Sequence, residues 1–382
     1  MQFDYFYNMY DVERRPYGQV LADAVAQTVR AEELGFSTVW TGEHHFGGEG
    51  YDIQPNPILT LMLLASHTST IRLGLAAVIL PGWHPLRLAE DLAVLDHVSG
   101  GRLDCGVGRG ITNREMSNLS SFDVDRRYPQ GNAEIFLETL DILRKAWTED
   151  PFTWEGTYYS FPRPGVADSY AGWFPRNPGW RDDAGQYVGM SIVPKPLQTP
   201  HPPLWNVGDS DESFRLSAEQ GLRPITWLRS EAALASSFEV YRAAASTVQG
   251  RELALGEQCS LMRVCYVAET HEKAREIAEP AVERLFRDYI GGLRSRAIYA
   301  EPGETISERD LEKPWFDFLD ERGHLLVGTP DEISERLTRM RDSVGLERLL
   351  VYSWLPELNQ SEILSSLELF GQEIVPAFAS PS

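Results

Sequence analysis

The chain has 382 residues, of which 42% are hydrophobic and 11% aromatic, and its formal net charge at pH 7 is −21. This composition is sufficient for a large hydrophobic core, and the acidic charge argues against nucleic acid or an anionic membrane as the main partner, because both require a basic surface. The length fits one large α/β barrel with insertions or two ordinary domains.

The apolar pattern predicts strands and helices that alternate along the chain. Strands are predicted near residues 3, 38, 73, 104, 205, 225, 262 and 350, and helices over 19–34, 57–68, 85–98, 132–147, 211–220, 232–248 and 271–289, from 330, and within 363–370. The helix from 330 has the strongest start signal, because Thr329, Pro330 and Glu332 form a capping box with proline at the first helical position. Eight alternating units favour a closed (β/α)8 TIM barrel over an open sheet.

Several segments interrupt this alternation. Residues 111–130 form a polar loop, 152–161 read as a hairpin outside the main repeat, 163–193 are rich in proline, glycine and tryptophan, and 291–323 have no helical or strand period. Irregular stretches of this length usually shape a binding site, act as a lid or are disordered. We therefore predict a single α/β barrel domain over 1–382, with insertions at the carboxyl-end loops near 111–130, 152–200 and 291–323.

Cysteine usage and the chain start bear on location. The three cysteines form no CxxC pair, and Cys105 and Cys265 lie in apolar runs, where a free thiol behaves as a small hydrophobic group. Residues 1–10 are strand-like and lack the basic segment and apolar stretch of a secretion signal, and no apolar run is long enough to span a bilayer. These features predict a cytoplasmic protein with no membrane partner.

Two predicted strand ends carry groups suited to an anion. Arg109 stands between Gly108 and Gly110 at the carboxyl end of a predicted parallel strand, where α/β proteins hold anionic ligands. Ser210 lies where a strand passes into a helix, so its hydroxyl and the next N–H groups point at one spot that the helix dipole makes favourable for an anion. The alternatives are a surface arginine in a loop that needs flexible glycines, and an ordinary N-cap without a ligand.

The string Glu43-His44-His45-Phe46 follows the second predicted strand. His44 is a candidate catalytic residue, because a histidine pKa of about 6.5 suits proton transfer near neutral pH, and the alternative is a structural histidine in a loop. His45 is interpreted as structural, and Glu43 either supports His44 or caps the turn. No cysteine or carboxylate cluster accompanies the two histidines, so no metal site is predicted.

Aromatic residues stand near several predicted strand ends. Phe6 and Phe46 are candidates for the wall of a substrate pocket, and Trp227 for contact with a cofactor. The alternative for each is an ordinary core position, because aromatic side chains fill the ends of many barrels.

A set of short strings in one order along about three hundred residues resembles the bacterial luciferase-like flavin monooxygenases. The strings are Trp40 with Glu43-His44-His45-Phe46, Ile71-Arg72-Leu73-Gly74, His84-Pro85, Gly100-Gly101-Arg102, Gly106-Val107-Gly108-Arg109-Gly110, Pro202-Pro203-Leu204-Trp205 and Gly328-Thr329-Pro330. Each string alone is weak, and their shared order carries the resemblance.

The resemblance implies a barrel that binds FMN at the carboxyl ends of its strands. It also implies a two-component monooxygenase, in which a separate NAD(P)H-dependent flavin reductase supplies reduced FMN and O2 reacts with it to a C4a-peroxyflavin. The expected substrate is a small, mostly apolar organic molecule, and the expected assembly is a homodimer. Two alternatives remain: a deazaflavin-dependent oxidoreductase that transfers hydride on the same fold, and a flavin-binding relative without catalysis.

The resemblance also assigns roles to residues. His44 falls on the active-site histidine, Ala76-Ala77 on a non-prolyl cis peptide against the flavin ring, and Arg109 on the phosphate-binding arginine. The loop with Gly208, Ser210 and Asp211 falls on the second phosphate contact.

The match is imperfect at three places. Asp209 and Asp211 place two carboxylates near an anion, so Ser210 and the backbone are the better phosphate ligands. Luciferase has a cysteine where this chain has Gly108, and residues 163–193 match no family element.

Overall fold

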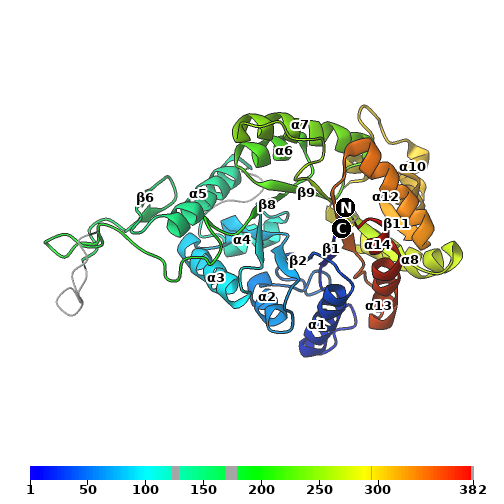
Figure 1. Cartoon of the computed structure of the whole chain (residues 1–382), viewed down its shortest axis with the longest axis horizontal. Helices are drawn as coiled ribbons and strands as arrows, with labels where there is room; N and C mark the ends of the chain where they lie inside the picture. The colour runs from blue at the N-terminus through cyan, green and yellow to red at the C-terminus, as the bar shows by residue number, and fades with distance from the viewer. Residues whose placement is uncertain (123–128, 168–178, 294, 380–382) are drawn as a thin grey trace. The chain divides into compact units, whose positions relative to one another are not determined.

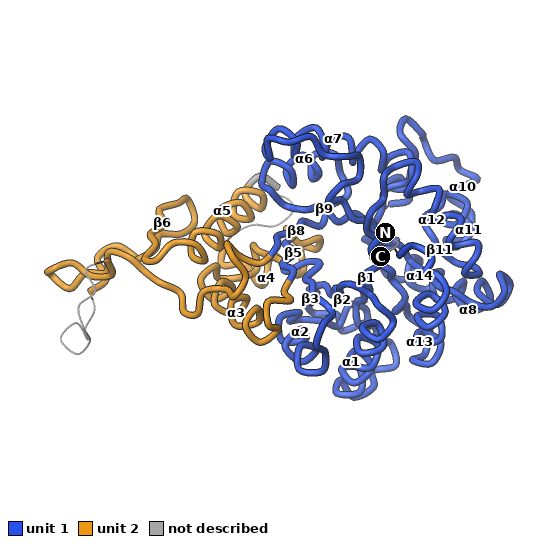
Figure 2. The backbone as a smooth tube through the Cα atoms, in the orientation of Figure 1, with its two compact units in different colours: residues 1–78, 104–107, 203–382 blue, residues 79–103, 108–202 orange. Residues whose placement is uncertain are grey.

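The computed structural model describes residues 1–122, 129–167, 179–293 and 295–379. Contacts within the chain divide it into two compact units (Figure 2): unit 1 is Met1–Val78, Asp104–Val107 and Pro203–Ser382, and unit 2 is Ile79–Leu103 and Gly108–Pro202. This division does not test the prediction of a single domain with insertions, which stays a prediction.

Unit 1 is built on a ring of parallel strands. The ring strands are β1 (Gln2–Tyr7), β2 (Thr38–Thr41), β3 (Arg72–Leu75), β5 (Leu103–Gly108), β8 (Leu204–Val207), β9 (Arg223–Thr226), β10 (Ser260–Val267) and β12 (Arg348–Tyr352). The hydrogen-bonded order is β12-β1-β2-β3-β5-β8-β9, and β10 closes the ring because it pairs with both β9 and β12. The predicted (β/α)8 barrel is therefore confirmed, with all eight ring strands at the predicted positions.

Two further strands were not predicted. β11 (Leu325–Gly328) pairs with the second half of β10, and β4 (Val78–Ile79) pairs with β5. The apolar run over 71–80, for which one strand near residue 73 was predicted, thus forms two strands, β3 and β4, separated by Ala76-Ala77.

Helices of unit 1 lie outside the ring (Figure 1). They are α1 (Tyr17–Glu33), α2 (Pro57–Ala65), α6 (Asp211–Glu219), α7 (Glu231–Gln249), α8 (His271–Leu285), α9 (Gly291–Leu293), α10 (Glu308–Glu312), α11 (Trp315–Glu321), α12 (Pro330–Val344), α13 (Gln360–Leu369) and α14 (Val375–Ala377), with π-helical turns η2 (Phe286–Ile290) and η4 (Phe370–Ile374) and a 3-10 turn η3 (Arg296–Tyr299). The capping box of Thr329 and Glu332 at α12 is present as predicted.

The sequence suggested that the segment 291–323 is irregular throughout, but part of it is helical. It contains η3, α10 and α11, and α11 buries Phe316, Phe318 and Leu319. These helices are too short to show a helical period in sequence, and Pro314 separates α10 from α11. The prediction that this segment is irregular was wrong for that reason, whereas its prediction as an insertion stays a prediction.

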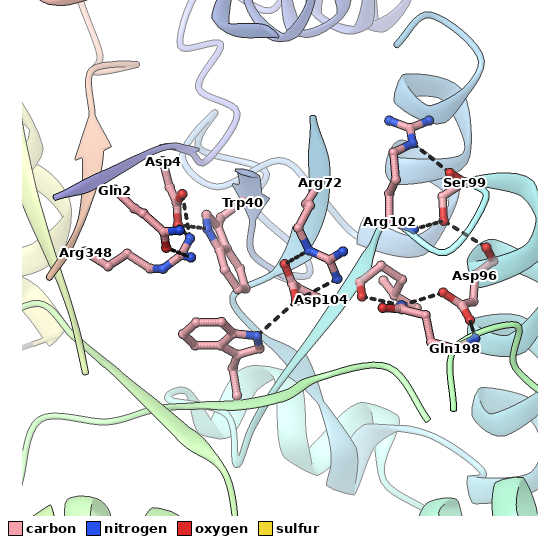
Figure 3. Close-up of polar contacts among 12 residues, drawn as sticks. Gln2, Asp4, Trp40, Arg72, Asp96, Ser99, Arg102, Asp104, Gln198 and Arg348 are labelled. Atoms are coloured by element: carbon pink, nitrogen blue, oxygen red, sulfur yellow. Dashed lines mark hydrogen bonds and ion pairs between the residues drawn. The ribbon is translucent and has the colours of Figure 1, made fainter. Parts of the chain in front are cut away.

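Ion pairs fill the amino-terminal half of the ring (Figure 3). Arg348 Nη1 donates to Asp4 Oδ1 at 2.8 Å and to Oδ2 at 2.6 Å, and Arg72 Nε donates to Asp104 Oδ2 at 2.7 Å. Burial raises the pKa of Asp4, even though Arg348 favours its charged form. Because charged pairs occupy this end, ligands are expected at the carboxyl end, where barrel enzymes hold them.

Two tryptophans pack beside these pairs. Trp40 Nε1 donates to Asp4 at 2.8 Å (Figure 3). The rings of Trp40 and Trp205 meet edge to face at 5.1 Å. Gly74 makes room for this layer, because a Cβ there would stand 2.2 Å from Trp40 Cε3. The ring interior is therefore a packed core rather than a channel.

Glu32 at the end of α1 fastens the loop that precedes β3. Its Oε1 accepts from the N–H groups of Ser69, Thr70 and Ile71 at 2.9, 2.6 and 2.8 Å. Partial burial acts to raise the pKa of this carboxyl, but the three N–H groups outweigh it and the pKa is lowered to about 2.

Unit 2 contains η1 (Leu80–Gly82), α3 (Pro85–Val98), α4 (Asn113–Leu119), α5 (Pro129–Thr148), β6 (Trp154–Glu155) and β7 (Ser160–Phe161). α5 is joined to α3 by Trp147 Nε1, which donates to the carbonyl of Ala89 at 3.0 Å. Gln198 contacts α3, because its backbone N–H donates to Asp96 Oδ2 at 2.8 Å (Figure 3).

The predicted hairpin over 152–161 is present as the antiparallel pair β6 and β7. The predicted polar loop over 111–130 contains α4, and its residues 123–128 lie outside the described chain, as do residues 168–178 of the 163–193 segment. Within the described residues, no helix is both long and apolar enough to cross a membrane.

Candidate active site

His44 lies in the loop between β2 and α2, which folds back on itself. The His44 N–H donates to the carbonyl of Gln54 at 3.0 Å, and the Ile53 N–H donates to the carbonyl of Met9 in the β1–α1 connection at 2.9 Å. The loop is thus tied to itself and to the carboxyl end of β1. The His44 side chain is 16% exposed, so it is largely buried but still reachable.

Asp52, in the same loop, faces His44. The distance between His44 Nε2 and Asp52 Oδ2 is 3.6 Å, and Asp52 is 3% exposed. Its backbone is left-handed with φ of 48°, a conformation that Asp tolerates better than most residues. Its second oxygen, Oδ1, is buried and has no hydrogen-bond partner among the described residues. Asp52 was not among the residues predicted from the sequence.

The neighbouring pair explains the rest of the motif. His45 Nε2 and Glu43 Oε1 are 2.8 Å apart, which supports a structural role for His45 and gives Glu43 a partner other than His44. Among the described residues, no group of three or more His, Cys, Asp or Glu side chains is placed to hold a metal ion.

An aromatic cluster stands at the carboxyl ends of β1, β9 and β12. The ring of Tyr352 meets Phe6 edge to face at 5.0 Å and Trp227 at 5.9 Å, and its hydroxyl is hydrogen-bonded to that of Tyr10. Phe6 is buried and Trp227 is half-buried. Two predicted residues therefore meet, through the unpredicted Tyr352.

The tyrosine pair lies within electrostatic reach of Asp52. Burial, and then the Asp52 carboxylate, raise the pKa of both Tyr10 and Tyr352 well above the ordinary tyrosine value. Asp52 thus acts electrostatically on both hydroxyl groups, and Tyr352 carries one of them into the aromatic cluster.

Phe46 does not join this cluster among the described ring contacts. Its ring is 52% exposed, its backbone φ is 61°, and its ring neighbour is His45 at 5.9 Å. Its predicted place in a substrate pocket stays a prediction.

The Ala76-Ala77 peptide is cis, as the resemblance implied. The Ala76 N–H donates to the carbonyl of Thr41 at 2.8 Å, beside the start of the His44 loop. Gly42 permits this close approach, because a Cβ there would stand 2.8 Å from Asn8 Oδ1 and 3.4 Å from the Ala76 carbonyl oxygen. Contact of this peptide with a flavin stays a prediction.

Asp209, in the loop after β8, is turned toward the end of β9. Its Oδ1 accepts from the Thr226 hydroxyl at 2.8 Å and from the N–H groups of Trp227 and Leu228 at 2.8 and 2.9 Å. This carboxylate therefore fixes the backbone that carries Trp227.

Ser210 is the N-cap of α6. Its hydroxyl accepts from the Ser213 N–H at 3.1 Å, and the Ser213 hydroxyl accepts from the Ser210 N–H at 3.1 Å, which makes a reciprocal cap. Gly208 allows the turn, because a Cβ there would stand 2.6 Å from Ser213 Oγ. Asp211 accepts from Arg229 and from the Ser237 hydroxyl. Both acids near Ser210 thus have hydrogen-bond donors of their own.

Arg263, a fully buried residue of β10, holds the same backbone from the other side. Its Nη1 donates to the carbonyl of Trp227 at 2.5 Å, and its Nη2 donates to the carbonyl of Arg229. Burial lowers the pKa of this guanidinium to about 10. The sequence did contain a signal for this structural role, because Arg263 stands in a strand that is otherwise mostly apolar.

Arg109 belongs to unit 2 and follows the last residue of β5. Its side chain is exposed, and its carbonyl accepts from Asn132 Nδ2 at 3.0 Å. Gly110 has φ of 76°, and a Cβ there would stand 2.9 Å from Met116 Sδ. The glycine is therefore required by the backbone, and the phosphate-binding role of Arg109 stays a prediction.

Comparison with known proteins identifies the family. Residues 1–347 match the sequence model of the family described as luciferase-like monooxygenase. The chain belongs to this family. The predicted resemblance is thereby confirmed, and the chain is an enzyme of the flavin-dependent monooxygenase class.

Relatives of this luciferase-like chain cover nearly its whole length. The oxygenase component of the flavin-dependent trigonelline monooxygenase of Acinetobacter baylyi is 26% identical over 391 residues, covering 99% of this chain and 96% of its own. An alkanal monooxygenase alpha chain of Photorhabdus luminescens is 24% identical over 390 residues, covering 98% and 97%.

Solved structures share the fold. Monooxygenase RslO1 of Streptomyces bottropensis has a TM-score of 0.78 at 25% identity, covering 99% of this chain and 100% of its own. The oxygenating constituent of 3,6-diketocamphane monooxygenase of Pseudomonas putida, solved with FMN, has a TM-score of 0.77 at 21% identity, covering 100% and 99%.

Proposed function

We propose that this chain is the oxygenase component of a two-component monooxygenase that uses reduced FMN and O2 to oxygenate a small, mostly apolar organic substrate. The carrying observation is the position of His44, which stands in a loop tied to the carboxyl end of β1, where Phe6 packs in the aromatic cluster. The family and the FMN named for a related structure support the choice of cofactor.

The loop after β8 fits the phosphate of FMN. Ser210 is exposed at the amino end of α6, whose dipole and first-turn N–H groups favour an anion. Asp209 and Asp211 accept hydrogen bonds from their own donors, which reduces the charge conflict that the sequence suggested. Glu212 is an exposed opposing charge in the first turn, so we assign the phosphate contact to Ser210 and the backbone.

When bound, reduced FMN supplies the electrons that activate O2. The residues of the chain then have three tasks. Trp227 and the Ala76-Ala77 peptide orient the flavin, Phe6 and Tyr352 keep water from the reacting groups, and His44 holds a proton at Nε2 on the side of Asp52.

We further propose that a separate NAD(P)H-dependent flavin reductase supplies the reduced FMN. The name of the trigonelline relative, an oxygenase component, supports this division of labour. The homodimer and the cytoplasmic location stay predictions. An F420-dependent secondary alcohol dehydrogenase shares the fold at 16% identity with a TM-score of 0.69, and we do not assign its cofactor to this chain.

An anaerobic titration tests this proposal. The protein is titrated with reduced FMN, and O2 is then admitted with a panel of apolar aldehydes and ketones while oxygenated product and hydrogen peroxide are measured. We expect the wild type to bind reduced FMN and form product, and His44→Gln to bind it within about twofold and release hydrogen peroxide instead. Failure to bind reduced FMN, or product formation by His44→Gln at the wild-type rate, contradicts the proposal.

A further inference from the structure

Asp52 is a buried carboxylate with a single described ion-pair partner. It is 3% exposed, and the ion pair it makes among the described residues is with His44, at 3.6 Å. A buried charge is unfavourable unless an opposite charge or hydrogen bonds compensate it. Because Oδ1 has no hydrogen-bond partner in the described chain, the compensation for Asp52 falls on the imidazole.

The loop backbone is arranged so that the carboxylate faces back toward His44. Asp52 has φ of 48°, and the next residue, Ile53, is anchored to the carbonyl of Met9. Gly47 lies against this turn, since a Cβ there would stand 2.4 Å from the carbonyl oxygen of Tyr51 and 3.1 Å from that of Asp52. A left-handed non-glycine residue is uncommon and is found enriched at functional sites.

Other polar groups around Asp52 have partners of their own. Tyr10, from the β1–α1 connection, and Tyr352, from β12, hydrogen-bond to each other. The Tyr51 hydroxyl accepts from Arg284 Nε of α8 at 3.2 Å, and the Tyr51 ring stacks on that of Tyr289 in η2 at 5.3 Å.

Several charged side chains near Asp52 also pair with other groups. In the loop that carries His44, Glu43 pairs with His45, and beyond Tyr51 the Arg284 side chain pairs with Asp288 and Glu357. These pairs leave the ion pair with His44 as the one that Asp52 makes among the described residues.

We infer that Asp52 is a positioning residue for the proposed reaction. Its carboxylate holds the His44 ring through Nε2 and stabilises the protonated form of the imidazole. The effect of Asp52 on catalysis rests on the proposed function. The electrostatic interaction between the Asp52 and His44 side chains does not, because it exists in the protein without flavin. A carboxylate that fixes the tautomer and raises the basicity of a histidine converts it into an effective proton acceptor. His44 thereby becomes a general base rather than a passive hydrogen-bond donor.

The coupling is tested first on the flavin-free protein. The imidazole resonances are followed by NMR across the pH range, with His44→Gln used to assign the His44 signal. Coulomb's law at 3.6 Å gives a shift of about 0.8 pH unit even at the dielectric constant of water, so Asp52→Asn is expected to lower the His44 titration midpoint by at least that amount. Asparagine is chosen because it also tolerates the left-handed backbone.

Asp11→Asn is the matched control. Asp11 is 7% exposed, lies in the neighbouring loop and pairs with Arg15 at 2.7 Å. This variant removes a buried carboxylate of the same region, and the His44 midpoint is expected to stay within about 0.2 pH unit of wild type. A His44 midpoint in Asp52→Asn that equals that of Asp11→Asn overturns the inference.

Turnover supplies the second readout. With reduced FMN and O2, Asp52→Asn is expected to lower kcat at least about 10-fold and to move the acidic limb of the pH profile, while Asp52→Glu restores part of kcat. An unchanged pH profile in Asp52→Asn contradicts the inference. If reduced FMN does not bind the wild type but the NMR shift is found, the proposed function fails and the pairing of Asp52 with His44 stands.

Discussion

Replacement of Asp209 tests how the end of β9 is held in place. Asp209→Ala removes the acceptor of three hydrogen bonds, from the Thr226 hydroxyl and from the N–H groups of Trp227 and Leu228, at 2.8 to 2.9 Å. A hydrogen bond to a charged group contributes about 1.5–3 kcal/mol. Since Asp209 is only partly buried, water replaces part of the loss, and we expect a local destabilisation of about 2–4 kcal/mol.

Hydrogen exchange at the two amides measures this local effect directly. The expected destabilisation corresponds to exchange that is about 30- to 1000-fold faster at Trp227 and Leu228, with Leu204–Val207 of β8 unchanged as the internal reference. Asp209→Asn keeps one acceptor oxygen and is expected to show about half of the loss in free energy. Exchange within about threefold of wild type in Asp209→Ala would refute the assignment of Asp209 as the residue that fixes this backbone.

Three further predictions concern the ring, the α1 connection and the helix cap. Gly74→Ala places a Cβ 2.2 Å from the Trp40 ring, so we expect a lower Tm by several degrees in thermal melts, whereas Gly18→Ala, with no atom within 4 Å, leaves the Tm nearly unchanged. The pKa of Glu32 is about 2 in the folded protein and 4.5 in the unfolded chain, so its stabilisation is present above about pH 4.5 and is lost as the pH falls toward 2. Glu32→Gln is therefore expected to be about 1–2 kcal/mol less stable than wild type at neutral pH. In acid unfolding, the stability of this variant should also depend less steeply on pH between 4.5 and 2. Ser210→Ala removes the cap of α6, at a cost of about 1 kcal/mol, and weakens reduced-FMN binding, while Ser210→Thr keeps both; equal affinity in Ser210→Ala and wild type contradicts the phosphate contact.

Sequence alone was sufficient for the ring because buried parallel strands appear as apolar runs with a helix between them. It was not sufficient for β3 and β4, because the run over 71–80 is apolar apart from Arg72 and nothing in its composition marks the turn at Ala76-Ala77. β11 is four residues long, and α10 and α11 are five and seven, which is too short for a period to be recognised.

The candidate site was only partly predictable for a different reason. His44 and Ser210 stand in short motifs at strand ends, and such positions are recognisable without a structure. Asp52 lies in a glycine-rich loop without a motif, and its orientation toward His44 depends on a left-handed backbone and on contacts with the β1–α1 connection. Arg263 was recognisable in principle, because a charge inside an apolar strand requires buried acceptors.

Closure of the ring ties the first strand of the chain to the last. β1 pairs with β12 in the register Phe3↔Leu349, and the amino group of Met1 donates to the carbonyl of Phe378 at 3.2 Å. During synthesis, β1 therefore leaves the ribosome long before one of its two partners exists, and an unpaired strand edge is prone to associate with other chains. We expect the yield of this enzyme in a cell to depend on how well chaperones shield that edge until the C-terminal strand emerges.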